Sequence, residues 1–210
     1  MQAFDPGCRR CGRLAAFLAE VGSRYPVYFA RPVPSFGDPR ARLLVVGLAP
    51  GLHGANRTGR PFTGDHAGIL LYRTLHERGF ASRAESVAAE DGLELRDCRI
   101  TNAVRCLPPA NKPLPAEVRA CNPFLAWELA RVPAGGAVLA LGAVAHGAVL
   151  RALGMATSAA RFAHGACHPL PGERLMVDSY HCSRYNTQTR RLTPAMFAEA
   201  VACAREWLDR

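Results

Sequence analysis

The segment at residues 47–66, GLAPGLHGANRTGRPFTGDH, holds a dense set of residues that could form a binding site. Gly54 and Gly59 have the glycine spacing of a phosphate-binding P-loop, but Arg60 and Pro61 follow where that loop requires lysine and a hydroxyl residue, which argues against nucleotide hydrolysis. The glycines instead let the backbone approach a flat ligand closely. The aromatic residue at 62 offers a stacking surface and the aspartate at 65 is the only carboxylate, a combination that suits a nucleobase.

Structural alternatives exist for both of these side chains. Phe62 could fill the core, and Asp65 could cap the helix that follows it. A second polar segment favours the functional interpretation. In SYHCSRYNTQTRR, residues 179–191, His181 directly follows an apolar stretch and precedes hydroxyl, amide and guanidinium donors suited to phosphate oxygens.

Cysteine content points to a metal site. In a chain without secretory features, eight cysteines indicate metal binding rather than disulfides. Cys8 and Cys11 form the only close pair, and Cys106 and Cys121 are the best candidates to complete a set of four. Spacing alone leaves zinc and an iron–sulfur cluster both open. Small buried thiols are expected at the other positions, with Cys182 undecided; these are Cys98, Cys167, Cys182 and Cys203.

The charge balance favours a polyanionic partner. There are 26 Lys+Arg against 17 Asp+Glu, which gives a formal net charge of +9, and Lys112 is the only lysine. Nucleic acid is such a partner, although basic composition alone is weak evidence. With 210 residues, 49% of them apolar, the chain is long enough for one full core. No apolar run approaches the roughly 18 residues of a membrane span, and no signal peptide is seen, so we expect a cytoplasmic, nucleoid-associated protein without membrane contact.

The hydrophobic periodicity alternates between strand and helix, as in an α/β layered fold. Strands are predicted at 42–48, 98–104, 137–141, 162–167 and 175–179, and helices at 11–22, 66–78, 116–131, 143–154 and 194–208. The arm at 25–39 should be irregular because proline recurs in it, and 82–97 fits either helix or loop. Chemistry at a parallel sheet lies at the carboxyl ends of its strands, where three polar segments fall: 49–66, 105–115 and 180–191.

Three long segments in order carry a resemblance. GLAPGLHGANRTGRPFTGD, NAVRCLPPANKP and SYHCSRYNTQTRRLT, with FARPVPSFGDP before them and the four spaced cysteines, closely resemble the family 5 (type B) uracil-DNA glycosylases over nearly the whole chain. The resemblance implies a three-layer α/β/α sandwich around a mainly parallel four-stranded sheet. It implies one domain, 1–210, with a cluster-binding helix and arm at 1–41 packed on it. The cysteines would hold a structural 4Fe–4S iron–sulfur cluster; they are Cys8, Cys11, Cys106 and Cys121.

By the same resemblance, the protein flips a damaged base out of DNA and hydrolyses its N-glycosidic bond. Asp65 would activate water or stabilise the sugar cation, His181 would donate a hydrogen bond to the leaving base, and Asn111 would be catalytic or contact the base. The base would be bound by Gly47, Leu48, Ala49, Gly51, Phe62 and Asn102. DNA would be contacted by Arg57, Arg60, Lys112, Ser183, Arg184, Asn186 and Arg190.

Some positions depart from related sequences. Ala49 stands where the best-known uracil-DNA glycosylases have an aspartate, a difference that the type B family shares. The small side chain predicts a roomier pocket, and with it release of hypoxanthine, hydroxymethyluracil and ethenocytosine besides uracil. Cys182 and Arg190 replace an apolar residue or proline and a glycine, and Arg190 adds a cation near the DNA path. We expect a monomer acting on DNA that contains uracil or other deaminated bases.

Two other function classes fit parts of the sequence. A non-catalytic, metal-stapled nucleic-acid binding module accounts for the charge and the cysteines without any role for Asp65 or His181. A metal-dependent hydrolase would use Asp65, His66 and His168. The binding module predicts that no abasic product forms, and the hydrolase predicts that a chelator abolishes activity.

Overall fold

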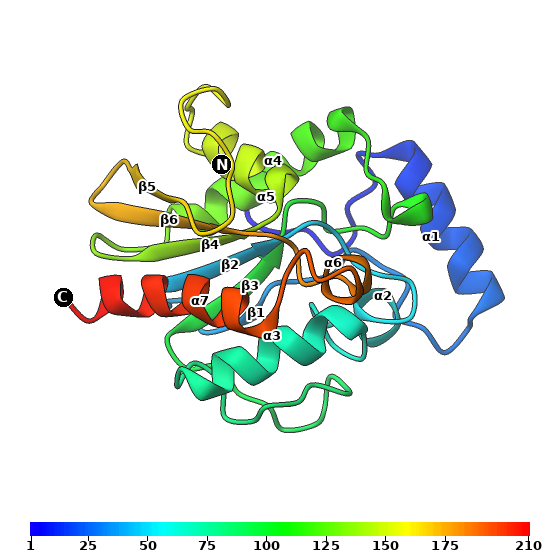
Figure 1. Ribbon diagram of the computed structural model, residues 1–210. Helices are drawn as coiled ribbons and strands as arrows, with labels where there is room; N and C mark the ends of the chain where they lie inside the picture. Colours follow the sequence, from blue (N-terminus) through cyan, green and yellow to red (C-terminus); the bar gives the residue numbers. More distant parts are fainter.

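A six-stranded sheet runs through the protein, with helices on both of its faces (Figure 1). The computed structural model describes residues 1–210. The strand order is β1-β3-β2-β4-β6-β5; the four inner strands are parallel, and the two edge strands are antiparallel to their neighbours. The strands are β1 (Phe36–Gly37), β2 (Leu43–Gly47), β3 (Cys98–Asn102), β4 (Ala137–Leu141), β5 (Cys167–Leu170) and β6 (Arg174–Ser179).

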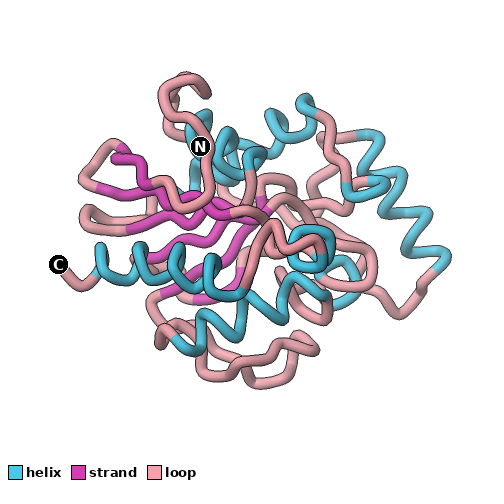
Figure 2. Tube along the Cα trace, in the orientation of Figure 1, coloured by secondary structure: helices cyan, strands magenta, loops and turns pink.

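Two helices cover each face of the sheet. One face carries α3 (His66–Glu77) and α7 (Pro194–Leu208), and the other carries α4 (Pro115–Leu129) and α5 (Ala143–Ala152). Figure 2 shows the three layers, with α1 (Gly12–Arg24) beyond them at one end. The remaining elements are short: α2 (Ala55–Thr58), the single 3₁₀ turn Pro109–Asn111, and α6 (Arg184–Gln188). No helix combines the length and apolar content needed to span a membrane.

The inner strands are apolar on both sides because both sides are covered. In β2, Leu43 and Val45 belong to the core under α3 and α7, whereas Leu44 and Val46 belong to the core under α4 and α5. Since successive side chains of a strand point to opposite faces, one uninterrupted apolar run supplies both cores. The parallel register ends β2 and β3 level with each other, which sets Gly47 beside Asn102.

The predicted α/β class and the four parallel inner strands are confirmed, and the edge strands extend the sheet to six. The arm predicted to be irregular contains β1, where Phe36 pairs with Ile100. The strand predicted at 162–167 is wrong: β5 begins at its last residue, because a turn with Gly165 at φ +76° occupies the preceding positions. Segment 82–97 is a loop, with one bridge between Ala81 and Leu95.

Candidate active site

A pocket of about 440 Å³ opens at the carboxyl ends of the parallel strands. The three predicted polar segments meet in it, and a fourth, at 141–144, was missed because its residues carry no reactive group. Short helices α2 and α6 gather at this end of the sheet (Figure 1). The lining residues are Leu48, Ala49, Gly51, Ala55, Phe62, Asp65, His66, Ala67, Asn102, Asn111, Leu141, Gly142, Ala143, Val144, His181, Ser183 and Arg184.

Asp65 caps α3 and lines this pocket at the same time. Its Oδ1 atom accepts a hydrogen bond from the Gly68 amide at 2.8 Å, so the prediction that Asp65 caps the following helix is confirmed. Its Oδ2 atom lies over the loop at Gly51 and Gly54 instead. Burial raises the pKa of the Asp65 carboxyl above its ordinary value, against the opposing effect of the Gly68 and Ala67 amides. One carboxylate oxygen is thus fixed by the helix cap, and the other lies against the loop before α2.

Phe62 and His181 lie next to each other in the wall of this pocket. Their rings are stacked, with centroids 5.8 Å apart and planes 28° from parallel. The Phe62 ring and the Asn102 side chain pack directly on Gly47, where a Cβ atom would lie 2.5 Å from Phe62 Cζ and 2.3 Å from Asn102 Oδ1. Phe62 has a backbone φ of +54°, a left-handed conformation that is rare for an aromatic residue. Its ring position is therefore imposed by the surrounding loop.

His181 is neutral at physiological pH. It follows β6, and Asn186 Nδ2 donates to its carbonyl oxygen at 2.8 Å. Burial lowers the pKa of His181 to about 4. Its Nδ1 atom is buried without a partner, so in the tautomer with the proton on Nε2 the imidazole offers a hydrogen-bond donor on its other edge.

Two amide side chains border the pocket. Asn102, at the end of β3, is buried, and its Oδ1 atom has no hydrogen-bond partner in the protein. Asn111 is exposed and has φ +55°, a conformation that asparagine tolerates better than most residues. A buried, unpartnered amide oxygen is costly, and a bound ligand can satisfy it.

Most of the predicted DNA contacts lie on the surface. The exposed side chains are Arg57, Lys112, Arg184 and Arg190. Ser183 accepts a hydrogen bond from the Asn186 amide, so it caps α6. The side-chain nitrogen of Asn186 is already used in holding the His181 carbonyl.

The prediction that Arg60 contacts DNA is wrong. Arg60 is 5% exposed, and its guanidinium pairs with Asp91 at 2.6 Å. Every nitrogen of the guanidinium donates to a protein oxygen, so none is free for a phosphate. The sequence placed Arg60 near Arg57, but packing turned the two side chains in different directions.

His66 is a pocket residue that the glycosylase interpretation of the sequence overlooked. Its Nε2 atom lies 2.9 Å from Thr187 Oγ1, which ties the start of α3 to α6. The metal-hydrolase alternative, which joined Asp65, His66 and His168, is not supported. His168 lies outside this pocket, with its Nε2 atom 3.0 Å from the buried carboxylate of Asp178, which also pairs with His146.

The four predicted cysteine ligands converge. Cys8, Cys11, Cys106 and Cys121 line one small cavity between α1, the loop after β3 and α4. The backbone amide of Arg105 donates to Cys121 Sγ at 3.3 Å. Burial raises the pKa of Cys106 to about 12 and that of Cys121 to about 11, with a further contribution from the neighbouring thiols. Among the other cysteines, Cys98 and Cys182 are buried, whereas Cys167 is exposed, contrary to expectation.

The cavity has the donor set of a metal centre. Four thiols with a peptide N–H directed at one sulfur fit thiolate ligation of a zinc ion or of an iron–sulfur cluster.

Comparison with known proteins agrees with this geometry. The model of the Uracil DNA glycosylase superfamily matches residues 34–205. A type-5 uracil-DNA glycosylase of Thermus thermophilus is 51% identical over 203 residues, which cover 94% of this chain and 92% of the relative. Type-5 enzymes of Mycobacterium tuberculosis and Pyrobaculum aerophilum are each 44% identical, over 95% and 92% of this chain and 77% and 86% of their own length. The chain therefore belongs to the uracil DNA glycosylase superfamily, within its type-5 family.

Proposed function

We propose that this protein excises uracil from DNA by hydrolysing the N-glycosidic bond, which leaves an abasic site. The observation that carries the proposal is the meeting of Asp65, Phe62 and His181 at one pocket. A carboxylate, an aromatic surface and a neutral imidazole donor are what the departure of a flipped pyrimidine requires. Type-5 relatives named as uracil-DNA glycosylases cover nearly the whole chain, which supports the same activity.

The residues divide the charge of the transition state between them. As the glycosidic bond breaks, positive charge develops on the sugar and negative charge on the base. His181 is neutral before the reaction, and its Nε2–H group donates a hydrogen bond to the base oxygen. Asp65 faces the sugar, where its Oδ2 atom orients water or stabilises the cation. Asn111, which also lines the pocket, holds the base or the water.

Base recognition uses stacking and amide contacts. Phe62 lines the pocket and stacks on the flipped base. Asn102 uses its amide to read the polar edge of the base, and the loop from Gly47 to Gly51 supplies backbone groups. A donor group on the flipped base then gives Asn102 Oδ1 a hydrogen-bond partner, which removes the free-energy cost of leaving that atom buried and unpaired.

A broad lesion range follows from the size of the pocket. Ala49 contributes only a methyl group to the wall, and the cavity measures about 440 Å³. We include hypoxanthine, hydroxymethyluracil and ethenocytosine among the bases released. A panel of oligonucleotides, each with one such lesion, tests this part separately. Release of uracil alone would contradict it.

The charged rim guides DNA to the pocket. Arg57, Lys112, Arg184 and Arg190 contact phosphates, which position the duplex without reading its sequence. Association should therefore weaken as salt is raised. We further propose that residues 1–210 act as a single domain and as a monomer, which sedimentation analysis of the enzyme with and without DNA would check.

Cys8, Cys11, Cys106 and Cys121 hold a 4Fe–4S cluster in this proposal. When bound, the cluster supplies cross-linking of distant segments rather than chemistry on the base. Arg13 already joins α1 to α4 through two contacts of 2.7 Å with Glu117. The ligands reinforce this junction, which orders the loop carrying Asn111.

The deciding experiment uses a labelled duplex with one G·U pair, incubated with the purified holoenzyme in the presence of EDTA. Alkali then cleaves any abasic strand, which is resolved on a gel. We expect cleavage by the wild type and none by Asp65→Asn. Equal DNA binding by both proteins with no abasic product from either would favour the binding module instead, and activity abolished by EDTA would favour a metal-dependent hydrolase.

A further inference from the structure

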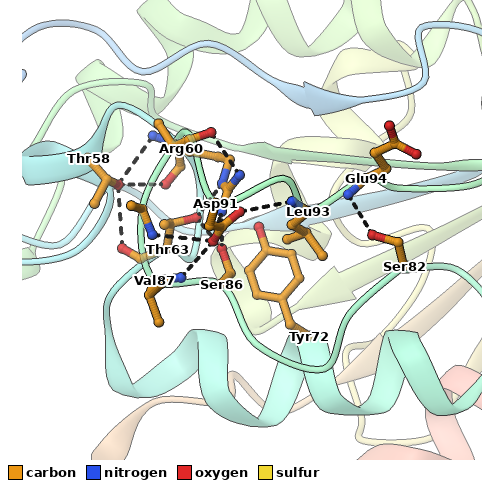
Figure 3. A network of polar contacts seen from close by, with 12 residues as sticks. Thr58, Arg60, Thr63, Tyr72, Ser82, Ser86, Val87, Asp91, Leu93 and Glu94 are labelled. Carbon is orange, nitrogen blue, oxygen red and sulfur yellow. Dashed lines mark hydrogen bonds and ion pairs between the residues drawn. The ribbon is translucent and has the colours of Figure 1, made fainter.

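The loop at residues 82–94 lies outside every motif of the sequence, yet it holds the catalytic segment in place. Figure 3 shows Asp91 and Ser86 of this loop directed at Arg60 and Thr63 of the segment that carries Phe62. Asp91 Oδ2 accepts from Arg60 Nη2 at 2.6 Å. Ser86 Oγ lies 2.7 Å from both Arg60 Nη2 and Thr63 Oγ1.

Arg60 is locked by this environment. Besides Asp91 and Ser86, it donates from Nε to Thr63 Oγ1 at 2.9 Å and from Nη1 to the Ala89 carbonyl at 3.1 Å. Its guanidinium also lies over the Phe36 ring, 4.7 Å from the centroid. A guanidinium cannot lose its charge in a protein, so burial at this position requires a carboxylate partner.

Asp91 is that partner, and it is itself fixed. Its Oδ2 atom accepts from the Val87 amide at 2.9 Å, and its Oδ1 atom accepts from the Leu93 amide at 3.0 Å. Although burial opposes ionisation, the hydrogen bonds from Arg60 and these amides hold the pKa of Asp91 well below its usual range. The carboxylate is therefore ionised throughout the range in which the protein works.

The network surrounds the residue proposed to stack on the base. Phe62 lies between Arg60 and Thr63 in sequence and has the left-handed φ of +54°. On its other side, the buried Tyr72 hydroxyl donates to the Pro61 carbonyl at 2.7 Å, and the Gly64 amide donates to the Ser86 carbonyl at 2.9 Å. A disfavoured backbone conformation persists only when its surroundings fix it from several sides.

We propose that Asp91 is a positioning residue for base excision, acting through Arg60 on the Phe62 ring and on the start of α3 at Asp65. This inference rests on the proposed uracil excision and adds a residue that touches neither base nor DNA. Loss of the Asp91 charge releases Arg60, lets residues 60–64 relax, and moves the stacking surface away from the flipped base.

The test compares Asp91→Asn, Asp91→Glu and wild type in single-turnover excision of uracil with enzyme in saturating excess. Rates are measured at a temperature where circular dichroism shows each variant folded. We expect Asp91→Asn to lower the rate per folded molecule about 10- to 100-fold, because small displacements of positioned groups carry large kinetic costs. Asp91→Glu should recover part of the rate. Affinity for a duplex with a tetrahydrofuran abasic analogue should stay within about twofold of wild type, since phosphate contacts are intact.

Asp97→Asn is the matched control. Asp97 also pairs with an arginine, Arg42, through contacts of 2.7 and 2.8 Å, but at the amino ends of the strands, opposite the pocket. Its substitution should leave the single-turnover rate unchanged. A purely structural role for Asp91 would lower the melting temperature of the variants and leave the rate per folded molecule at the wild-type value.

Ser86→Ala keeps the test decisive if Asp91→Asn does not fold. It removes the two contacts of the Ser86 hydroxyl but retains the ion pair, and we expect a threefold to tenfold slower excision, on the order of one lost hydrogen bond. Wild-type rates in Ser86→Ala and in every folded Asp91 variant would overturn the inference. An inactive wild type would instead overturn the proposed function, so the two failures are distinguishable.

Discussion

A Cβ atom on Gly54 would lie 2.4 Å from Asp65 Oδ2 and 2.6 Å from Asp65 Cβ. Real Cβ atoms essentially never approach other atoms so closely. The loop before α2 therefore packs directly on the proposed catalytic carboxylate, and only glycine permits this. The contact links a loop residue to the position of the Oδ2 atom, the oxygen that the α3 cap leaves free.

Gly54→Ala should displace Asp65 and impair excision while the protein remains folded. We expect a loss of about 100-fold in the single-turnover rate, the cost typical of a misplaced reacting group. Gly147→Ala is the control, because a Cβ atom at this α5 position meets nothing closer than 4.0 Å. It should raise stability by about 0.5–1 kcal/mol without changing the rate. An unchanged excision rate in Gly54→Ala would mean that excision does not depend on the position of Asp65 Oδ2.

Asp65→Asn should separate activity from stability. Asparagine caps helices as well as aspartate does, and it removes a carboxylate whose pKa burial raises. We expect at least about 100-fold slower excision and a free energy of unfolding at pH 7 no lower than that of the wild type. The stability difference should shrink as the pH falls through the raised pKa, because protonated Asp65 no longer carries a buried charge. Urea unfolding at several pH values measures this.

His181 should make stability depend on pH. Its folded-state pKa of about 4 lies below the ordinary value of 6.5, so the unfolded chain takes up a proton first as the pH falls. Between those two values His181 should cost up to about 1.4 kcal/mol of stability per pH unit. His181→Gln should give a shallower slope of stability against pH. Identical slopes for His181→Gln and wild type would contradict a neutral buried imidazole.

Arg190→Gly should weaken DNA binding and raise the stability of the fold. Arg190 has φ +57°, where glycine is unstrained, so the substitution should stabilise the fold by about 1 kcal/mol and raise the melting temperature by about 3 °C. Removal of one phosphate contact should reduce the salt dependence of DNA binding by about one unit of slope. Glu173→Gly, with φ +56° in the turn between β5 and β6, should give a similar stabilisation with no change in slope. Equal slopes for Arg190→Gly and the wild type would remove Arg190 from the DNA contacts.

Cys106→Ser should remove the cluster and destabilise the protein. We expect loss of iron and acid-labile sulfide, loss of visible absorbance, and poor solubility, because the four cysteines join segments far apart in the chain. Cys203→Ser, outside that cavity, should keep all of these properties. Elemental analysis of both variants distinguishes iron from zinc. A soluble, fully active Cys106→Ser protein would refute the structural role.

The sequence alone determined much of the architecture and the chemistry. Apolar runs such as 137–141 predicted strands covered on both faces, and the parallel order brings their carboxyl ends together. The three polar segments were therefore expected at one edge of the sheet, which placed Asp65, Asn111 and His181 near one another. The four cysteines likewise stood out by number and spacing.

The contacts between those segments depend on loop packing that no sequence pattern reports. Arg60 belongs to a basic, polar segment, but it is buried because the loop at 82–94 folds over it and Asp91 forms an ion pair with its guanidinium. The wall at Leu141–Val144 has no reactive side chains, and so no sequence signal distinguished it. Periodicity reports which face of an element is covered, whereas the partner of a long charged side chain depends on how loops distant in sequence pack. Here that packing buried a predicted DNA contact, Arg60, beside the segment that carries Phe62.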